Sequence, residues 1–145
     1  MLFKRISRTD AEKVYIVVQN VSGGTLTAGY ACCFDLSSVD GVRVTKPATA
    51  NFQAFAGIAD ADIADSGYGL VQVYGYRSSA YIYRSTEKAT AAGVELELVN
   101  AVWGLSPVGG AIASGQTKAF AFACEAVTSS SSASYTTAKV FVRAL

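Results

Sequence analysis

Most of the chain consists of short runs in which apolar and polar residues alternate, as in strands that turn one face to a core. Glycine, serine and proline separate these runs, and no helical repeat lasts for three turns. Only short helical turns fit the sequence, one at 59–64 capped by Asp60 and another at 86–92. The pattern predicts strands over 13–21, 28–36, 42–45, 70–77, 80–84, 93–99, 118–127 and 138–145.

These runs predict an all-β fold, a single-domain β-sandwich or β-barrel of about eight strands. The strands 70–77 and 80–84 are expected to form a hairpin through Ser78 and Ser79. In 93–99, Leu96 and Leu98 should face inward, and Glu95 and Glu97 outward. The serine-rich segment 128–134 is typical of an exposed loop. The expected organisation is an N-terminal arm, 1–12, followed by a β domain, 13–145.

Length and composition fit one soluble domain with a core of its own. The 145 residues are 51% hydrophobic and 16% charged, unlike a disordered chain. Twelve basic and eleven acidic residues leave a net charge of +1, so no electrostatic attraction to nucleic acid or to an anionic membrane is expected. Neither is therefore an expected partner.

Catalytic chemistry is restricted because the chain has no histidine. Ser–His–Asp and Cys–His nucleophile pairs, histidine bases and histidine-ligated metals are all excluded. Asp60, Asp62 and Asp65 form the one carboxylate cluster, but Ala64 and Val71 stand where a calcium loop needs oxygen ligands. A polar turn is the better interpretation. We expect no catalytic residue, no metal, no cofactor and no enzymatic activity.

The cysteines and the N-terminal sequence bear on the compartment. The basic start lacks the apolar stretch of a secretory signal, and the apolar runs are too short to span a bilayer. Cys32 and Cys33 are adjacent and should point to opposite faces of a strand. Buried reduced thiols are expected, although Cys124 could pair with either cysteine. The pattern favours synthesis in a reducing cytoplasm.

Two features point to binding partners. Apolar and basic residues alternate in the arm, which suggests a docking segment, and the apolar content exceeds what one small core needs, which favours a homo-oligomer. Trp103 could also be a ligand platform, but a core or subunit-interface anchor is the more common role. The docking candidates are Phe3, Lys4, Arg5, Ile6 and Arg8. The subunit-interface candidates are Val102, Trp103 and Leu105.

One segment carries a family resemblance. Residues 55–76, FAGIADADIADSGYGLVQVYGY, contain a G-I-A…I-A…G-x-Y-G-x-V-Q-V-x-G pattern that resembles small virion proteins of tailed bacteriophages. The ending 137–145, TAKVFVRAL, is similar to the terminal strand of such proteins. The family that the chain resembles most is the head decoration, or capsid cement, proteins.

This resemblance implies an all-β, non-enzymatic protein, often a homotrimer, that binds the major capsid protein. Its place would be the outside of the capsid, where it stabilises contacts between capsomers after synthesis in the host cytoplasm. No capsid-contact residue is carried over from the family. Two alternatives stay open: a neck, tail or fibre-associated virion protein, and a carbohydrate-binding β-sandwich for host adhesion whose tyrosines and Trp103 stack on sugars.

Overall fold

The chain folds into nine strands among the residues that the computed structural model describes, namely 12–38, 40–84, 89, 91–108 and 120–144. The strands are β1 (Lys13–Asn20), β2 (Ala31–Phe34), β3 (Arg43–Thr45), β4 (Phe55–Ala59), β5 (Tyr68–Arg84), β6 (Glu95–Leu98), β7 (Leu105–Pro107), β8 (Ala121–Ala123) and β9 (Ser134–Arg143). A six-residue 3₁₀ helix, η1 (Thr49–Ala54), leads into β4. The prediction of an all-β, single-domain fold is confirmed. Within the described ranges, no helix has the length and apolar character needed to cross a membrane.

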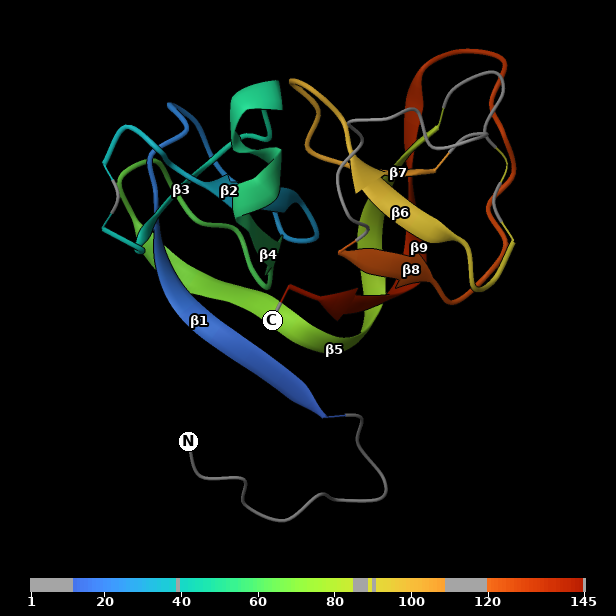
Figure 1. Cartoon of the computed structure of the whole chain (residues 1–145), viewed down its shortest axis with the longest axis horizontal. Helices are drawn as coiled ribbons and strands as arrows, with labels where there is room; N and C mark the ends of the chain where they lie inside the picture. Colours follow the sequence, from blue (N-terminus) through green and yellow to red (C-terminus); the bar gives the residue numbers. More distant parts are fainter. Residues whose placement is uncertain (1–11, 39, 85–88, 90, 109–119, 145) are drawn as a thin grey trace.

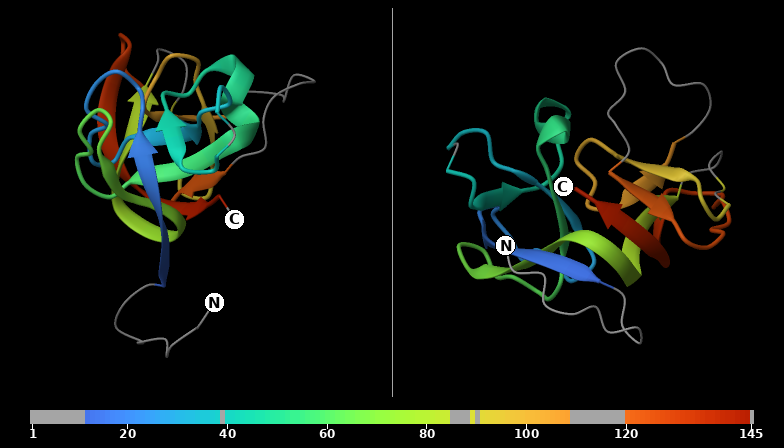
Figure 2. Two further views of the ribbon diagram at one scale, coloured as in Figure 1. Left: turned by 90° about the vertical axis from the view of Figure 1, so that its left-hand side faces the viewer. Right: turned by 60° about the horizontal axis from the view of Figure 1, so that its bottom comes forward.

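The strand pairings close into two rings that share β5 (Figures 1 and 2). One ring runs β1–β3–β2–β4–β5 and returns to β1, and the other runs β5–β7–β6–β8–β9 and returns to β5. The first part of β5 pairs with β1 and the remainder pairs with β9, both antiparallel. This single 17-residue strand therefore joins the two halves of the molecule.

Each ring encloses its own group of buried apolar side chains. Val18, Val44 and Val71 belong to the core of the β1 ring, whereas Ile82, Leu96 and Val140 belong to the core of the β9 ring. Strand β2 contributes to both, because alternate residues of a strand point to opposite faces. It forms part of the wall between the two cores.

The adjacent cysteines show this division directly. Cys32 is buried in the core of the β1 ring and Cys33 in that of the β9 ring, so the prediction of opposite faces is confirmed. Cys32, Cys33 and the half-buried Cys124 are all free thiols. Burial raises the pKa of Cys33 to about 12, and it raises the pKa of Cys32 further. Thiols held protonated in this way are poor nucleophiles and poor metal ligands.

Strand β5 bends where it passes from one ring to the other. The side-chain amide of Gln72, itself only 1% exposed, donates to the backbone carbonyls of Tyr74, Gly75 and Tyr76 at 3.1–3.2 Å. Gly75 has a φ of +102°, and a Cβ there would collide with the carbonyl oxygen of Glu12. The glycine therefore allows both the bend and the close approach of the start of β1.

The structure has two strands that the sequence pattern did not predict, β4 and β7, and it also differs from the prediction in the following elements. Residues 70–77 and 80–84 are not a hairpin but one strand with a bulge at Ser78 and Ser79, and both parts pair with β9. Two serines do not supply the positive φ angles that two-residue hairpin turns require. Residues 59–64 form no helical turn. Ala59 ends β4, and Asp62 and Asp65 accept hydrogen bonds from backbone N–H groups of the loop between β1 and β2. Glu97 is 8% exposed, so the expected outward position is wrong there.

A first prediction concerns the wall between the cores. Gly57 has a φ of +137°, and a Cβ would collide with the carbonyl oxygen of Gln72 and lie 2.7 Å from a methyl of Val71. We expect Gly57→Ala to lower the free energy of unfolding by about 2–5 kcal/mol through backbone strain and overpacking. Gly24→Ala, which has open space around it, is the control and should change it by less than about 0.5 kcal/mol. Urea denaturation measures both, and equal midpoints would contradict the packing described here.

Candidate docking surface on strands β1 and β5

Among the large apolar side chains on the described strands, the three with the highest exposed fraction lie together on β1 and β5. Val17 is 61% exposed and stands opposite Leu70, which is 45% exposed. Gln19 stands opposite Tyr68, which is 67% exposed. Tyr15 shares the outward face of β1 with Val17, since they are two residues apart. We call these five residues, Tyr15, Val17, Gln19, Tyr68 and Leu70, the β1–β5 strip.

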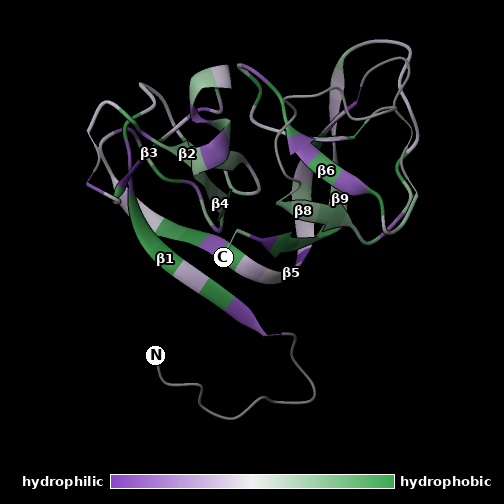
Figure 3. Ribbon diagram, in the orientation of Figure 1, coloured by the Kyte–Doolittle hydropathy of each residue, from purple (hydrophilic) through white to green (hydrophobic). Residues whose placement is uncertain are grey.

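The strip is possible because apolar residues occur on both faces of β1. Val18 on the inward face is fully buried, whereas its neighbour Val17 faces solvent. Figure 3 shows hydrophobic colour along most of β1 and the adjoining part of β5, next to the hydrophilic start of β1. Single exposed apolar residues are common on protein surfaces, but a contiguous group of them across two paired strands indicates a binding surface.

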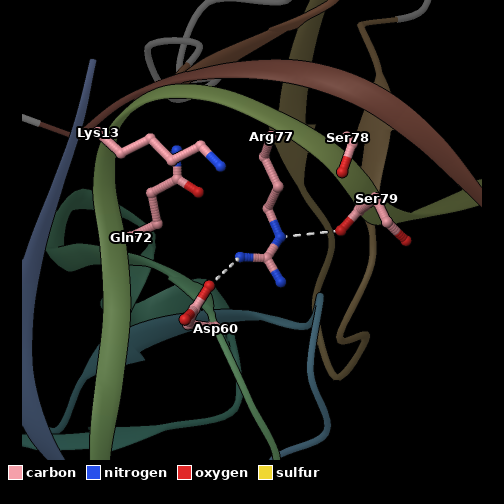
Figure 4. A pocket seen from close by; sticks show the side chains of 6 residues that line it. All are labelled: Lys13, Asp60, Gln72, Arg77, Ser78 and Ser79. Carbon is pink, nitrogen blue, oxygen red and sulfur yellow. Dashed lines mark hydrogen bonds and ion pairs between the residues drawn. The ribbon is translucent and has the colours of Figure 1, made fainter. Parts of the chain in front are cut away.

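A small polar pocket lies at the end of the strip (Figure 4). Its volume is about 120 Å³, and its wall contains an ion pair between Arg77 Nη1 and Asp60 Oδ1 at 3.2 Å. Arg77 Nε also donates to the carbonyl of Ser79 at 2.8 Å, and the arginine side chain is only 11% exposed. The pocket is lined by Lys13, Asp60, Gln72, Arg77, Ser78 and Ser79.

The pocket adjoins the strip at Tyr15, which stands opposite Gln72 of the pocket wall. Burial raises the pKa of the Tyr15 phenol, and the Asp60 carboxylate raises it further while Arg77 acts in the opposite direction. Lys13 and Arg77 against Asp60 leave one net positive charge, so this end of the surface favours an acidic group.

The aspartate cluster organises loops rather than an ion site. Asp62 accepts the backbone N–H of Ala28 at 2.8 Å, and Asp65 accepts that of Gly23 at 2.9 Å. Asp60 is engaged separately with Arg77. The three carboxylates hold different segments and do not converge, which agrees with their interpretation as a polar turn. Among the described residues, no group of three or more histidine, cysteine or acidic side chains is placed to bind a metal.

The predicted subunit-interface residues fall into two groups. Leu105, in β7, is 1% exposed and lies in the core of the β9 ring, so its side chain has no surface to offer a second subunit. Val102 and Trp103 are half-buried and remain candidates. The Trp103 ring is stacked on Tyr30 at 5.5 Å, and Lys46 Nζ lies 5.6 Å from its centroid. Much of its ring is thus engaged within the chain.

The aromatic residues of β5 continue this cluster across the molecule. Tyr81 packs edge-on against Tyr30 at 5.0 Å, and Tyr135 of β9 packs against Tyr81 and Tyr83. Tyr135 is the most exposed of the group, at 43%. Tyrosines of β5 therefore pair with an aromatic residue of the neighbouring strand β9, as aromatic side chains commonly do across strands.

The arm candidates cannot be placed. Phe3, Lys4, Arg5, Ile6 and Arg8 lie outside the described residues. Strand β1 begins at Lys13, so the arm leads directly into the end of the strip that carries the polar pocket.

Comparison with known proteins adds no assignment, since no protein-family model and no curated protein matches the chain.

The sequence analysis missed the strip and the pocket. The sequence did contain a signal for the strip. Residues 14–18, Val-Tyr-Ile-Val-Val, are apolar at every position and do not alternate with polar residues, and the polar Lys13 precedes them. Such a run has either both faces buried or one apolar face in solvent. The pocket has no comparable signal, because Asp60 and Arg77 meet only through the pairing of β4 with β5.

A second prediction concerns the ion pair of the pocket. Asp60→Asn removes the countercharge of a guanidinium that is nearly nine-tenths buried, so the free energy of unfolding should fall by about 1–2 kcal/mol. The control is Glu95→Gln, which breaks a 2.7 Å pair with Arg143 whose two side chains are half exposed. That change should cost less than about 1 kcal/mol. Chemical denaturation would contradict the prediction if the Glu95 variant were the less stable of the two.

Proposed function

We propose that the chain is a structural virion protein that binds the outside of a tailed-phage capsid and stabilises contacts between capsomers. The resemblance of residues 55–76 to decoration proteins supports this role. The structural observation that supports it is the β1–β5 strip, where Val17, Leu70 and Tyr68 expose apolar surface on two paired strands. The partner is the major capsid protein.

The chemistry of the strip suits docking rather than catalysis. Its exposed members are apolar or aromatic, and the neighbouring pocket holds its one carboxylate in an ion pair with Arg77. A net charge of +1 gives little long-range attraction, so affinity has to come from buried apolar area. Aromatic and aliphatic anchors with a charged rim are the usual anatomy of such interfaces.

A strip of five residues is smaller than a stable interface, which buries roughly 800 Å² on each partner. Further contacts are therefore needed, and we propose that the N-terminal arm and a homotrimeric assembly supply them. Three linked copies make the second and third contacts intramolecular, which raises avidity by about 10²–10⁴. Val102 and Trp103 remain the candidates for the contact between subunits.

A third prediction tests the strip. Leu70→Glu places a charge in the interface and should weaken binding to capsid shells by about 10–100-fold, the effect of losing one buried leucine. Leu36→Glu is the matched control, because Leu36 is 49% exposed but lies in the turn after β2. It should bind within about twofold of the unaltered protein. Sedimentation with shells at limiting protein measures both, and equal affinities for the two variants would exclude the strip.

A fourth prediction tests the arm. Deleting residues 1–10 leaves every described strand intact, so the far-UV circular dichroism and the thermal midpoint should be unchanged. Shell occupancy should fall by at least about tenfold, because Phe3 and Ile6 would no longer bury apolar surface. Unchanged occupancy of the truncated protein at limiting concentration would rule out the arm as a capsid contact.

A further inference from the structure

Among the described residues, part of one edge of β1 has no strand beside it. The backbone N–H of Asn20 donates to Gly67 and its carbonyl accepts from Ser66, so this residue turns its backbone groups toward β5. The N–H of Gln19 donates to Val42 on the other side. Because these directions alternate along an antiparallel strand, Tyr15 and Val17 turn their backbone groups to the same side as Gln19.

On the side of β1 that faces away from β5, strand β3 covers Gln19, whereas the preceding residues of β1 are open. Strand β3 pairs with β1 only at Gln19 and Asn20, and in the described part of the chain no strand pairs with this edge at Tyr15 or Val17. Figure 1 shows β1 along the margin of the molecule with β5 on one side, and the right-hand view of Figure 2 agrees. Two consecutive pairs of strand donors and acceptors therefore face outward beside the exposed Val17 side chain.

Natural proteins usually protect such an edge with charge, proline or a bulge. The pairing of β1 with β5 contains one bulge, but its extra residue, Val73, is on β5. Strand β1 itself is therefore regular over Tyr15–Val18. The edge is also apolar, and Lys13 is its one charged residue. An unprotected edge of this kind accepts an extended segment by strand addition.

We propose that the partner adds an extended segment to the free edge of β1, with an acidic side chain near Lys13 and an apolar one beside Val17. This inference rests on the proposed function, because it assigns the segment to the major capsid protein. Backbone hydrogen bonds to Tyr15 and Val17 provide the register. Lys13 selects the carboxylate, since it lies on the strand next to the added segment and opposite charges are favourable across neighbouring strands.

The charge of the edge argues against a second copy of this chain as the occupant. Residues 13–18 of another copy carry no carboxylate, so they would bring Lys13 and leave the positive pocket without an acidic partner. Pairing of two identical edges also requires a two-fold axis, which produces a dimer and not the proposed trimer.

The test uses a substitution that acts on the free edge alone. The N–H of Val17 faces away from β5, so Val17→Pro removes one outward donor and keeps the β1–β5 ladder, whereas proline is otherwise excluded from paired strands. Val17→Ala retains the N–H and removes more apolar surface. With empty shells assembled from the major capsid protein of the same genome, we expect Val17→Pro to bind at least about tenfold more weakly than Val17→Ala.

Amide hydrogen exchange provides a second measurement that needs no variant. In the free protein, the amides of Tyr15 and Val17 should exchange fast and those of Ile16 and Val18 slowly. In shell-bound protein pulsed with D₂O and then released, the amides of Tyr15 and Val17 should be protected.

The outcomes separate the two proposals. Binding to shells without protection of Tyr15 and Val17, or with equal affinities for the proline and alanine variants, overturns strand addition and leaves the proposed function standing. Absence of binding to shells overturns the proposed function itself. Protection of the two amides in the protein alone at high concentration, with a dimer in analytical ultracentrifugation, overturns the assignment to a capsid segment and identifies a second copy as the occupant.

Discussion

The structure depends on one strand that belongs to two rings. Strand β5 contributes hydrogen bonds to both halves, and its bend decides how the halves meet. The side-chain amide of Gln72, which is buried, bridges the bend through contacts from its Nε2 to the carbonyls of Tyr74, Gly75 and Tyr76. An apolar residue of the same size would lose these hydrogen bonds, so replacing Gln72 should be destabilising.

The bend also creates the candidate docking surface. Before it, β5 runs beside β1 and exposes Leu70 and Tyr68; after it, β5 leaves β1 and joins β9, which puts Arg77 against Asp60. The start of β1 is consequently supported on one side only. An apolar strip, a polar pocket and an open strand edge thus follow from the same geometric feature. In strand addition, the backbone hydrogen bonds of an open edge give affinity and the neighbouring side-chain sites give specificity.

The sequence predicted the fold class because most strands have one face in a core, as in 138–145, where Ala138, Val140, Val142 and Ala144 recur at every second position. It missed β4 because Phe55–Ala59 is buried on both faces and has no alternation. It misread β5 because a bulge and a hairpin turn look alike when the partner strand is unknown. The opposite placement of Cys32 and Cys33 was predictable, since the period of a strand is local. The Asp60–Arg77 pair was not, since it depends on tertiary pairing.

The most direct test of the proposed role is the copy number of this chain in purified virions, measured against the major capsid protein on a quantitatively stained gel. A decoration protein occupies equivalent positions over the whole shell, so we expect on the order of hundreds of copies in each particle. About a dozen copies would instead indicate a closed ring at the neck or tail. That result, or the absence of the chain from virions, would contradict the assignment to the capsid surface.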